Sequence, residues 1–118
     1  MAQVILVVDD DADIVESMRD FLECEGYAVE VASNGHDALT MLERIGEPPS
    51  LILIDLLMPI MDGNELLAEL ARRPSLAAIP VVVMSAASTI AAPPGVVVIQ
   101  KPFGIKALYD VVKHACAR

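Results

Sequence analysis

Hydrophobic residues in this chain form two patterns that alternate from one end to the other. Short apolar runs bounded by turn residues indicate strands, most of them buried on both faces. Between the runs, apolar residues recur every three or four positions, which indicates amphipathic helices. Strands are expected at residues 4–8, 27–31, 51–55, 81–84 and 96–100.

Four helices are expected between and after these strands, each with one apolar face. Gly26, Gly46 and Pro74 mark the ends of the first three helices, because glycine and proline interrupt helical structure. The last helix is expected from about Gly104. The apolar faces consist of residues 14, 18, 21 and 22; 38, 39, 42 and 45; 66, 67 and 70; and 108, 111, 112 and 115.

Strands that alternate with helices predict a doubly wound α/β domain with a parallel sheet. The crossovers are expected to be right-handed and the helices to cover both faces. The carboxyl ends of parallel strands meet at one edge of the sheet, where ligands of such folds bind. Four of the five strands deliver polar residues to that edge, namely Asp9 and Asp10, Asp55, Ser85 and Lys101.

Composition limits the classes of function. A chain of 118 residues with 55% apolar and 21% charged residues is expected to form one globular domain over residues 1–118. A net charge of −9 without a Lys/Arg cluster argues against direct binding of nucleic acid or an anionic membrane. Cys24 and Cys116 make no disulfide framework, and the first residues lack the layout of a secretory signal, so a cytoplasmic protein is predicted.

Residues 79–99 contain no charged residue and are long enough to span a bilayer. Pro93, Pro94 and Gly95 interrupt this stretch, and Ser85, Ser88 and Thr89 add hydroxyl groups to it. Two short buried strands with a loop between them explain the same composition. We therefore expect no membrane helix.

The polar residues at the sheet edge point to phosphoryl chemistry. Three carboxylates that converge on one crevice repel one another unless a divalent cation lies between them, and Mg²⁺ suits a site of carboxylates and phosphate oxygens. With the metal in place, Asp55 can act as a nucleophile toward phosphorus and form an acyl phosphate. Lys101 offers a positive charge, and Ser85 a hydroxyl group, to the phosphoryl oxygens.

Four groups of residues together resemble the receiver domains of bacterial response regulators. They are Asp9-Asp10, the run from Asp55 through Leu56, Leu57, Met58, Pro59, Ile60, Met61 and Asp62 to Gly63, the pair Ser85-Ala86, and Lys101-Pro102-Phe103. Each group alone is modest evidence, but their order on these strands is specific to the family. The resemblance covers the full chain and implies the CheY-like fold, with strand order 2-1-3-4-5.

The resemblance also implies a mechanism. Asp55 would accept a phosphoryl group from a histidine kinase, a phosphotransfer protein or a small acyl phosphate. A downstream protein partner or output domain would then read the change, and the chain would not turn over an external substrate. Phosphoryl binding and switching would fall to Ser85, Ala86 and Lys101.

The family pattern further assigns the metal ligands. Asp10 and Asp55 would bind Mg²⁺ directly, Asp9 would bind it through water, and the backbone carbonyl of Leu57 would be a further ligand. The peptide bond between Lys101 and Pro102 is expected to be cis.

Two features depart from the family pattern. The fifth strand of a receiver usually carries an aromatic switch residue three positions before the lysine, where this chain has Val98. Only fifteen residues, 86–100, separate Ser85 from Lys101, so the fourth helix of the family is expected to be shortened or missing. The surface made by that helix, the fifth strand and the last helix is often used for dimers and output domains, so we expect this chain to signal through another face or a remodelled loop.

Several alternatives remain open at this stage. The chain could be a receiver-like interaction module that does not switch, which Val98 and the short connection favour. A small phosphatase with Asp9 as nucleophile and Asp11 as acid/base is a weaker alternative, although Asp11 is better explained as a helix N-cap. A flavin-binding flavodoxin-like protein shares the architecture but would need a hydroxyl-rich loop after the first strand. The kinase, the downstream target, homodimer formation and membership of a longer protein stay open.

Overall fold

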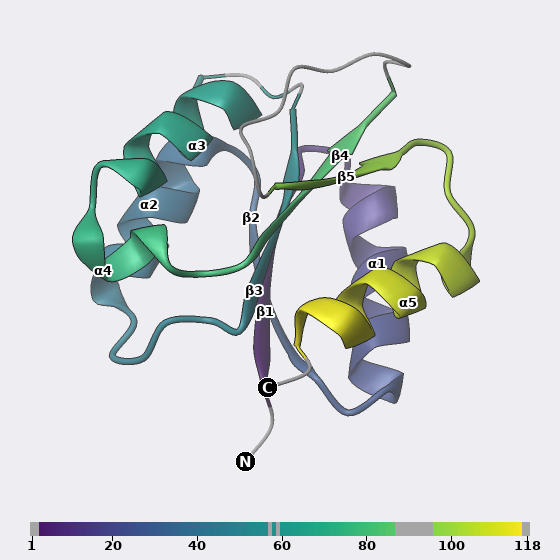
Figure 1. Ribbon diagram of the computed structural model, residues 1–118. Coiled ribbons are helices and arrows are strands. Elements are labelled where there is room, and N and C mark those ends of the chain that lie inside the picture. Colours follow the sequence, from purple (N-terminus) through teal and green to yellow (C-terminus); the bar gives the residue numbers. More distant parts are fainter. Residues whose placement is uncertain (1–2, 57, 59, 87–95, 117–118) are drawn as a thin grey trace.

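The computed structural model describes residues 3–56, 58, 60–86 and 96–116. Its centre is a five-stranded parallel sheet with the order β2-β1-β3-β4-β5 (Figure 1). The predicted strand order and fold class are therefore confirmed. The strands are β1 Val4–Val8, β2 Ala28–Ala32, β3 Leu51–Asp55, β4 Val81–Ser85 and β5 Val97–Gln100.

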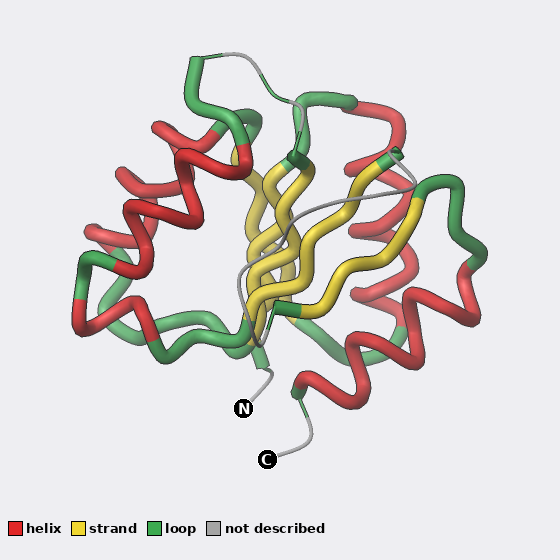
Figure 2. Tube along the Cα trace, turned by 45° about the horizontal axis from the view of Figure 1, so that its top comes forward, coloured by secondary structure: helices red, strands yellow, loops and turns green. Residues whose placement is uncertain are grey.

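Helices cover both faces of the sheet, as predicted (Figures 1 and 2). On one face lie α1 (Ala12–Cys24) and α5 (Ile105–Ala115), and on the other lie α2 (Gly35–Arg44) and α3 (Gly63–Ala71). The third predicted helix, α3, ends at Ala71, close to Pro74 as expected. A one-turn helix that was not predicted, α4 (Pro74–Ala77), follows it, with Pro74 in its first turn. The expected shortened or missing helix between β4 and β5 falls on residues 87–95, outside the described residues.

The core consists of two apolar layers, one on each face of the sheet. Every residue of β3 is buried, as the uninterrupted apolar run predicts for a central parallel strand. In the register of β1 and β3, Val8 lies opposite Ile54. The residues that follow, Asp9 and Asp55, are consequently neighbours at the edge of the sheet.

Side-chain caps fix where the helices begin. The carboxylate of Asp11 accepts hydrogen bonds from the backbone N–H groups of Asp13 and Ile14, which confirms its predicted role as the N-cap of α1. Asp62 and Glu65 form a reciprocal capping box at the start of α3. These caps fix the starts of α1 and α3, the helices that begin next to the sheet edge with the polar residues.

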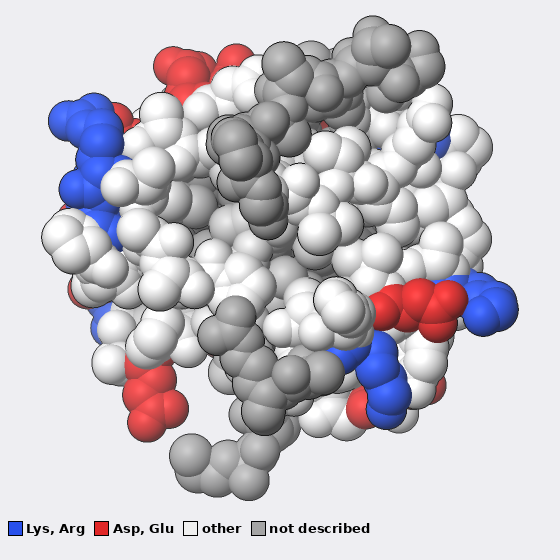
Figure 3. All heavy atoms as spheres, viewed as in Figure 1, with Lys and Arg blue, Asp and Glu red and all other residues white. Residues whose placement is uncertain are grey.

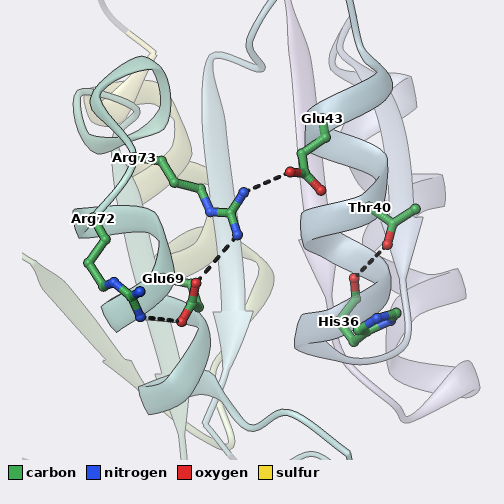
Figure 4. Close-up of polar contacts among 6 residues, drawn as sticks. All are labelled: His36, Thr40, Glu43, Glu69, Arg72 and Arg73. Carbon is green, nitrogen blue, oxygen red and sulfur yellow. Dashed lines mark hydrogen bonds and ion pairs between the residues drawn. The ribbon is translucent and has the colours of Figure 1, made fainter.

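Arg73 connects two helices on the surface away from that edge (Figure 4). Its guanidinium group lies 2.7 Å from Glu43 of α2 and 3.4 Å from Glu69 of α3, while Arg72 lies 2.7 Å from the other oxygen of Glu69. These hydrogen bonds raise the pKa of Arg73. Because exposed ion pairs contribute little free energy, the apolar layer beneath them accounts for most of the packing between α2 and α3.

Charged side chains are unevenly distributed over the surface. In the face shown in Figure 3 they lie toward the margins, and the described atoms at the centre belong to uncharged side chains. In the described part of the chain, no helix combines the length and the apolar character needed to cross a bilayer.

Candidate functional site

Three carboxylates meet at the carboxyl-terminal edge of the sheet. Asp9 and Asp10 follow β1, and Asp55 is the last residue of β3. One carboxylate oxygen of each lies within 4.8 Å of the others. Asp9 and Asp55 are buried, whereas Asp10 is exposed, so the cluster opens to solvent on the side of Asp10. The structure therefore brings together the three acids singled out in the sequence.

Lys101 reaches this cluster from the end of β5. Its ammonium group donates a hydrogen bond of 3.0 Å to Oδ2 of Asp9 and lies 3.6 Å from Oδ2 of Asp55. Burial lowers the pKa of Lys101, but the hydrogen bond to Asp9 and the charges of Asp9 and Asp55 outweigh burial, so its pKa lies above the ordinary value. The lysine is accordingly held in its charged form.

The backbone directs Lys101 inward. Its N–H group donates a hydrogen bond to the carbonyl oxygen of Ser85 at the end of β4, and the bond between Lys101 and Pro102 is cis, as the resemblance implies. Ser85 is buried and Ala86, the next residue, is exposed. The ends of β4 and β5 therefore bring Ser85, Ala86 and Lys101 to the same edge as the carboxylates.

Asp9 and Asp11 are both engaged in structural contacts. Oδ1 of Asp9 accepts a hydrogen bond of 2.9 Å from the backbone N–H of Asp11, and its Oδ2 accepts the bond from Lys101. The carboxylate of Asp11 caps α1. A nucleophile and its acid/base partner both need a free approach to substrate, so this geometry argues against the phosphatase alternative.

The backbone after Asp55 is packed against two glycines whose role the sequence analysis did not identify. A Cβ atom on Gly63 would lie 2.7 Å from the carbonyl oxygen of Asp55 and 2.7 Å from Cα of Leu56. A Cβ atom on Gly35 would lie 2.7 Å from Cγ of Met61. Both glycines directly follow the N-cap residue of a helix, a position that does not by itself require close packing, so the sequence carried no signal of these contacts.

Ile60 adopts a backbone conformation that is unusual for its type. Its φ angle is 69°, in the left-handed region that β-branched residues disfavour, and its side chain is 80% exposed. The residue lies in the loop between β3 and α3. The conformation of Ile60 is energetically unfavourable, so the surrounding structure must stabilise this loop.

One further predicted residue, Val98, is not among the residues of this cluster. Val98 is on β5, opposite Val83 of β4, and 39% of its surface is exposed. It places no aromatic ring at the position where the family has its switch. Leu57, the predicted carbonyl ligand, lies outside the described residues.

Comparisons with known proteins agree with this arrangement. The family described as the response regulator receiver domain matches residues 5–113. An uncharacterized 14.6 kDa protein of Leptolyngbya boryana is 44% identical over 82 residues, which are 70% of this chain and 61% of that protein. The transcriptional regulatory protein CpxR homolog of Haemophilus influenzae is 37% identical over 82 residues, 70% of this chain and 34% of that protein. The matched part of this chain thus spans less than two thirds of either relative.

Solved structures show the same fold. The signal receiver domain of a signal transduction histidine kinase from Syntrophus aciditrophicus has a TM-score of 0.85 and 33% identity, over 98% of this chain and 91% of that one. The receiver domain of sensor histidine kinase PA1611 from Pseudomonas aeruginosa has a TM-score of 0.88 and 21% identity over the full length of both chains. The latter holds a magnesium ion in its active-site cleft.

Proposed function

The chain belongs to the response regulator receiver domain family, and from this premise we propose that Asp55 accepts a phosphoryl group and that phosphorylation changes which partner the chain binds. One observation carries the proposal. The carboxylate of Asp55 lies at the end of a buried central strand, grouped with Asp9 and Asp10 and 3.6 Å from the ammonium group of Lys101. Carboxylate nucleophiles of this kind form acyl phosphates.

The donor set fits Mg²⁺. Three carboxylates face the single ammonium group of Lys101, so the cluster carries more negative than positive charge, and all its candidate ligand atoms are oxygens. Asp9, Asp10 and Asp55 would hold the ion, with the carbonyl of Leu57 as a further proposed ligand. When bound, Mg²⁺ neutralises charge on the phosphoryl oxygens and on the carboxylates.

The residues of the chain have distinct roles in the proposed transfer. An oxygen of Asp55 attacks phosphorus, the bond from phosphorus to the leaving group breaks, and the leaving group keeps that electron pair. The ammonium group of Lys101 and the hydroxyl group of Ser85 would donate hydrogen bonds to phosphoryl oxygens, with the N–H group of Ala86 as a third donor. We propose that these contacts draw Lys101 and Ser85 inward and shift a two-state equilibrium.

The proposed partners follow from the family. A histidine kinase or phosphotransfer protein would supply the phosphoryl group, and a downstream protein or output domain would bind one of the two states. We propose that the chain catalyses its own phosphorylation and dephosphorylation and is no turnover enzyme on an external substrate. A cytoplasmic location remains a prediction from the sequence.

A second candidate function is a receiver that binds its partner without switching. The observation that favours it is the partly exposed Val98 on β5, which offers no ring to report a movement of Ser85. Partner binding that is unchanged after complete phosphorylation of Asp55 would support this second function.

The proposed function is tested by measuring the intact mass of the protein after incubation with acetyl phosphate. We expect a single phosphoryl adduct with Mg²⁺ and none when EDTA removes the metal. Asp55→Asn should abolish the adduct, because an amide oxygen is a far weaker nucleophile than a carboxylate. Asp62→Asn is the matched control, since asparagine also caps helices, and should retain the adduct. An adduct that persists in Asp55→Asn would refute the assignment.

A further inference from the structure

An apolar groove of about 600 Å³ lies between α1 and the beginning of α5. Its walls include Ile14 of α1 on one side and Phe103 and Ile105 on the other. The volume lies within the range of small-molecule sites, which are commonly apolar with a few polar groups. The groove is separate from the carboxylate cluster but adjoins it.

One end of the groove reaches the proposed phosphoacceptor site. Lys101 and Ala86 both line the groove. The ammonium group of Lys101 also contacts Asp9 and Asp55, and Ala86 directly follows Ser85. A phosphoryl group held by Lys101 and the N–H group of Ala86 would therefore lie at the mouth of this apolar space.

The charges along the groove favour one orientation of an anion with an apolar body. Lys101 supplies positive charge at the site end, whereas Asp13, at the start of α1, supplies negative charge elsewhere in the lining. The anionic group is attracted to Lys101 and repelled by Asp13. The apolar body is left to contact Ile14, Phe103 and Ile105.

We propose, on the basis of the function proposed above, that this groove receives the leaving group of small-molecule phosphodonors and makes the chain prefer acyl phosphates with a long apolar acyl group. Asp55 attacks phosphorus, the bond between phosphorus and the acyl oxygen breaks, and the acyl group departs as a free carboxylate. No proton is gained or lost in this exchange. The leaving group departs on the side of phosphorus opposite Asp55, away from the carboxylate cluster.

The test compares acetyl phosphate with hexanoyl phosphate at equal concentration and saturating Mg²⁺. Their leaving carboxylates have nearly equal basicity, so the two donors differ mainly in apolar length. We expect hexanoyl phosphate to label Asp55 roughly tenfold faster, since each buried methylene group adds to the affinity. The rate of adduct formation is followed by intact-protein mass.

Two exposed isoleucines provide a matched pair of variants. Ile105 is 65% exposed and lines the groove, whereas Ile60 is 80% exposed and does not. Ile105→Ser should reduce the ratio of the hexanoyl to the acetyl rate to about threefold or less, and Ile60→Ser should leave it unchanged. Both substitutions are at exposed positions, so a loss of folding is not expected.

The outcomes separate this inference from the proposed function. Equal rates for the two donors, with a normal adduct on Asp55, would overturn the groove inference and leave the proposed function intact. A preference for hexanoyl phosphate that survives in Ile105→Ser would overturn it as well. Absence of an adduct with either donor would instead overturn the proposed chemistry of Asp55 and the inference with it.

Discussion

Two segments near Asp55 differ in how tightly they are packed. The first, which follows β3 and is named the β3 wall, consists of Leu56 and residues 60–63. Backbone atoms there lie so close to Gly63 that no Cβ fits. The β5 wall, made of residues 101–105, lines a groove, and a Cβ on Gly104 would meet no atom within 4 Å. The closed wall fixes the position of the nucleophile, while the open wall leaves room for the group that approaches it.

The largest expected difference in stability is between two glycine-to-serine substitutions, one in each wall. Gly63→Ser should lower the free energy of unfolding by about 2–3 kcal/mol, because the new Cβ would force apart the backbone at Asp55 and Leu56. Gly104→Ser should change it by less than about 0.5 kcal/mol, since Gly104 is the N-cap of α5 and serine is a good cap. Urea unfolding of both variants measures the difference. Equal costs would show that the two walls are equally packed.

A smaller effect is expected for Lys101 of the β5 wall, which pairs with Asp9 and Asp55. Lys101→Met should destabilise the metal-free protein by about 2 kcal/mol, because it leaves the fully buried carboxylate of Asp9 beside Asp55 without its cation. Mg²⁺ should restore part of this loss. Thermal unfolding in EDTA and in Mg²⁺ provides the measurement.

Lys106→Met is the control for this experiment. Lys106 pairs with Asp110 at 3.2 Å, but both side chains are largely exposed. The change should therefore cost less than about 0.5 kcal/mol, with or without Mg²⁺. If Lys101→Met were equally mild, the pairing of Lys101 with Asp9 would contribute no more to stability than an exposed ion pair.

The smallest expected changes in stability are those of two isoleucine-to-glycine substitutions, one in each wall, and they have opposite signs. Ile60→Gly should stabilise the protein by about 1 kcal/mol, because glycine adopts a positive φ angle without strain and the lost side chain is exposed. Ile105→Gly should destabilise it by less than about 0.5 kcal/mol, since glycine is a poor helix former but Ile105 is only the first residue of α5. Chemical denaturation resolves both changes, and destabilisation by Ile60→Gly would show that the loop does not relax as expected.

The sequence alone was enough to predict the fold class and the edge at which the site lies. A fully buried strand reads as an unbroken apolar run, and parallel strands place their carboxyl ends at one edge. Asp9, Asp10, Asp55 and Lys101 could therefore be expected to meet. The cap formed by Asp11 was also predictable, because it depends only on nearby backbone groups.

Only the tertiary structure decided which of these groups touch and how closely. The choice of Asp9 as the nearer partner of Lys101, the close approach of Gly35 to Met61, and the groove beside Lys101 all depend on segments far apart in the sequence. Residue type determines local backbone preference and the tendency to be buried, because both depend on the side chain of each residue and its near neighbours in the sequence. Distances of a few ångströms between remote segments arise from packing the whole domain, and no local pattern encodes them.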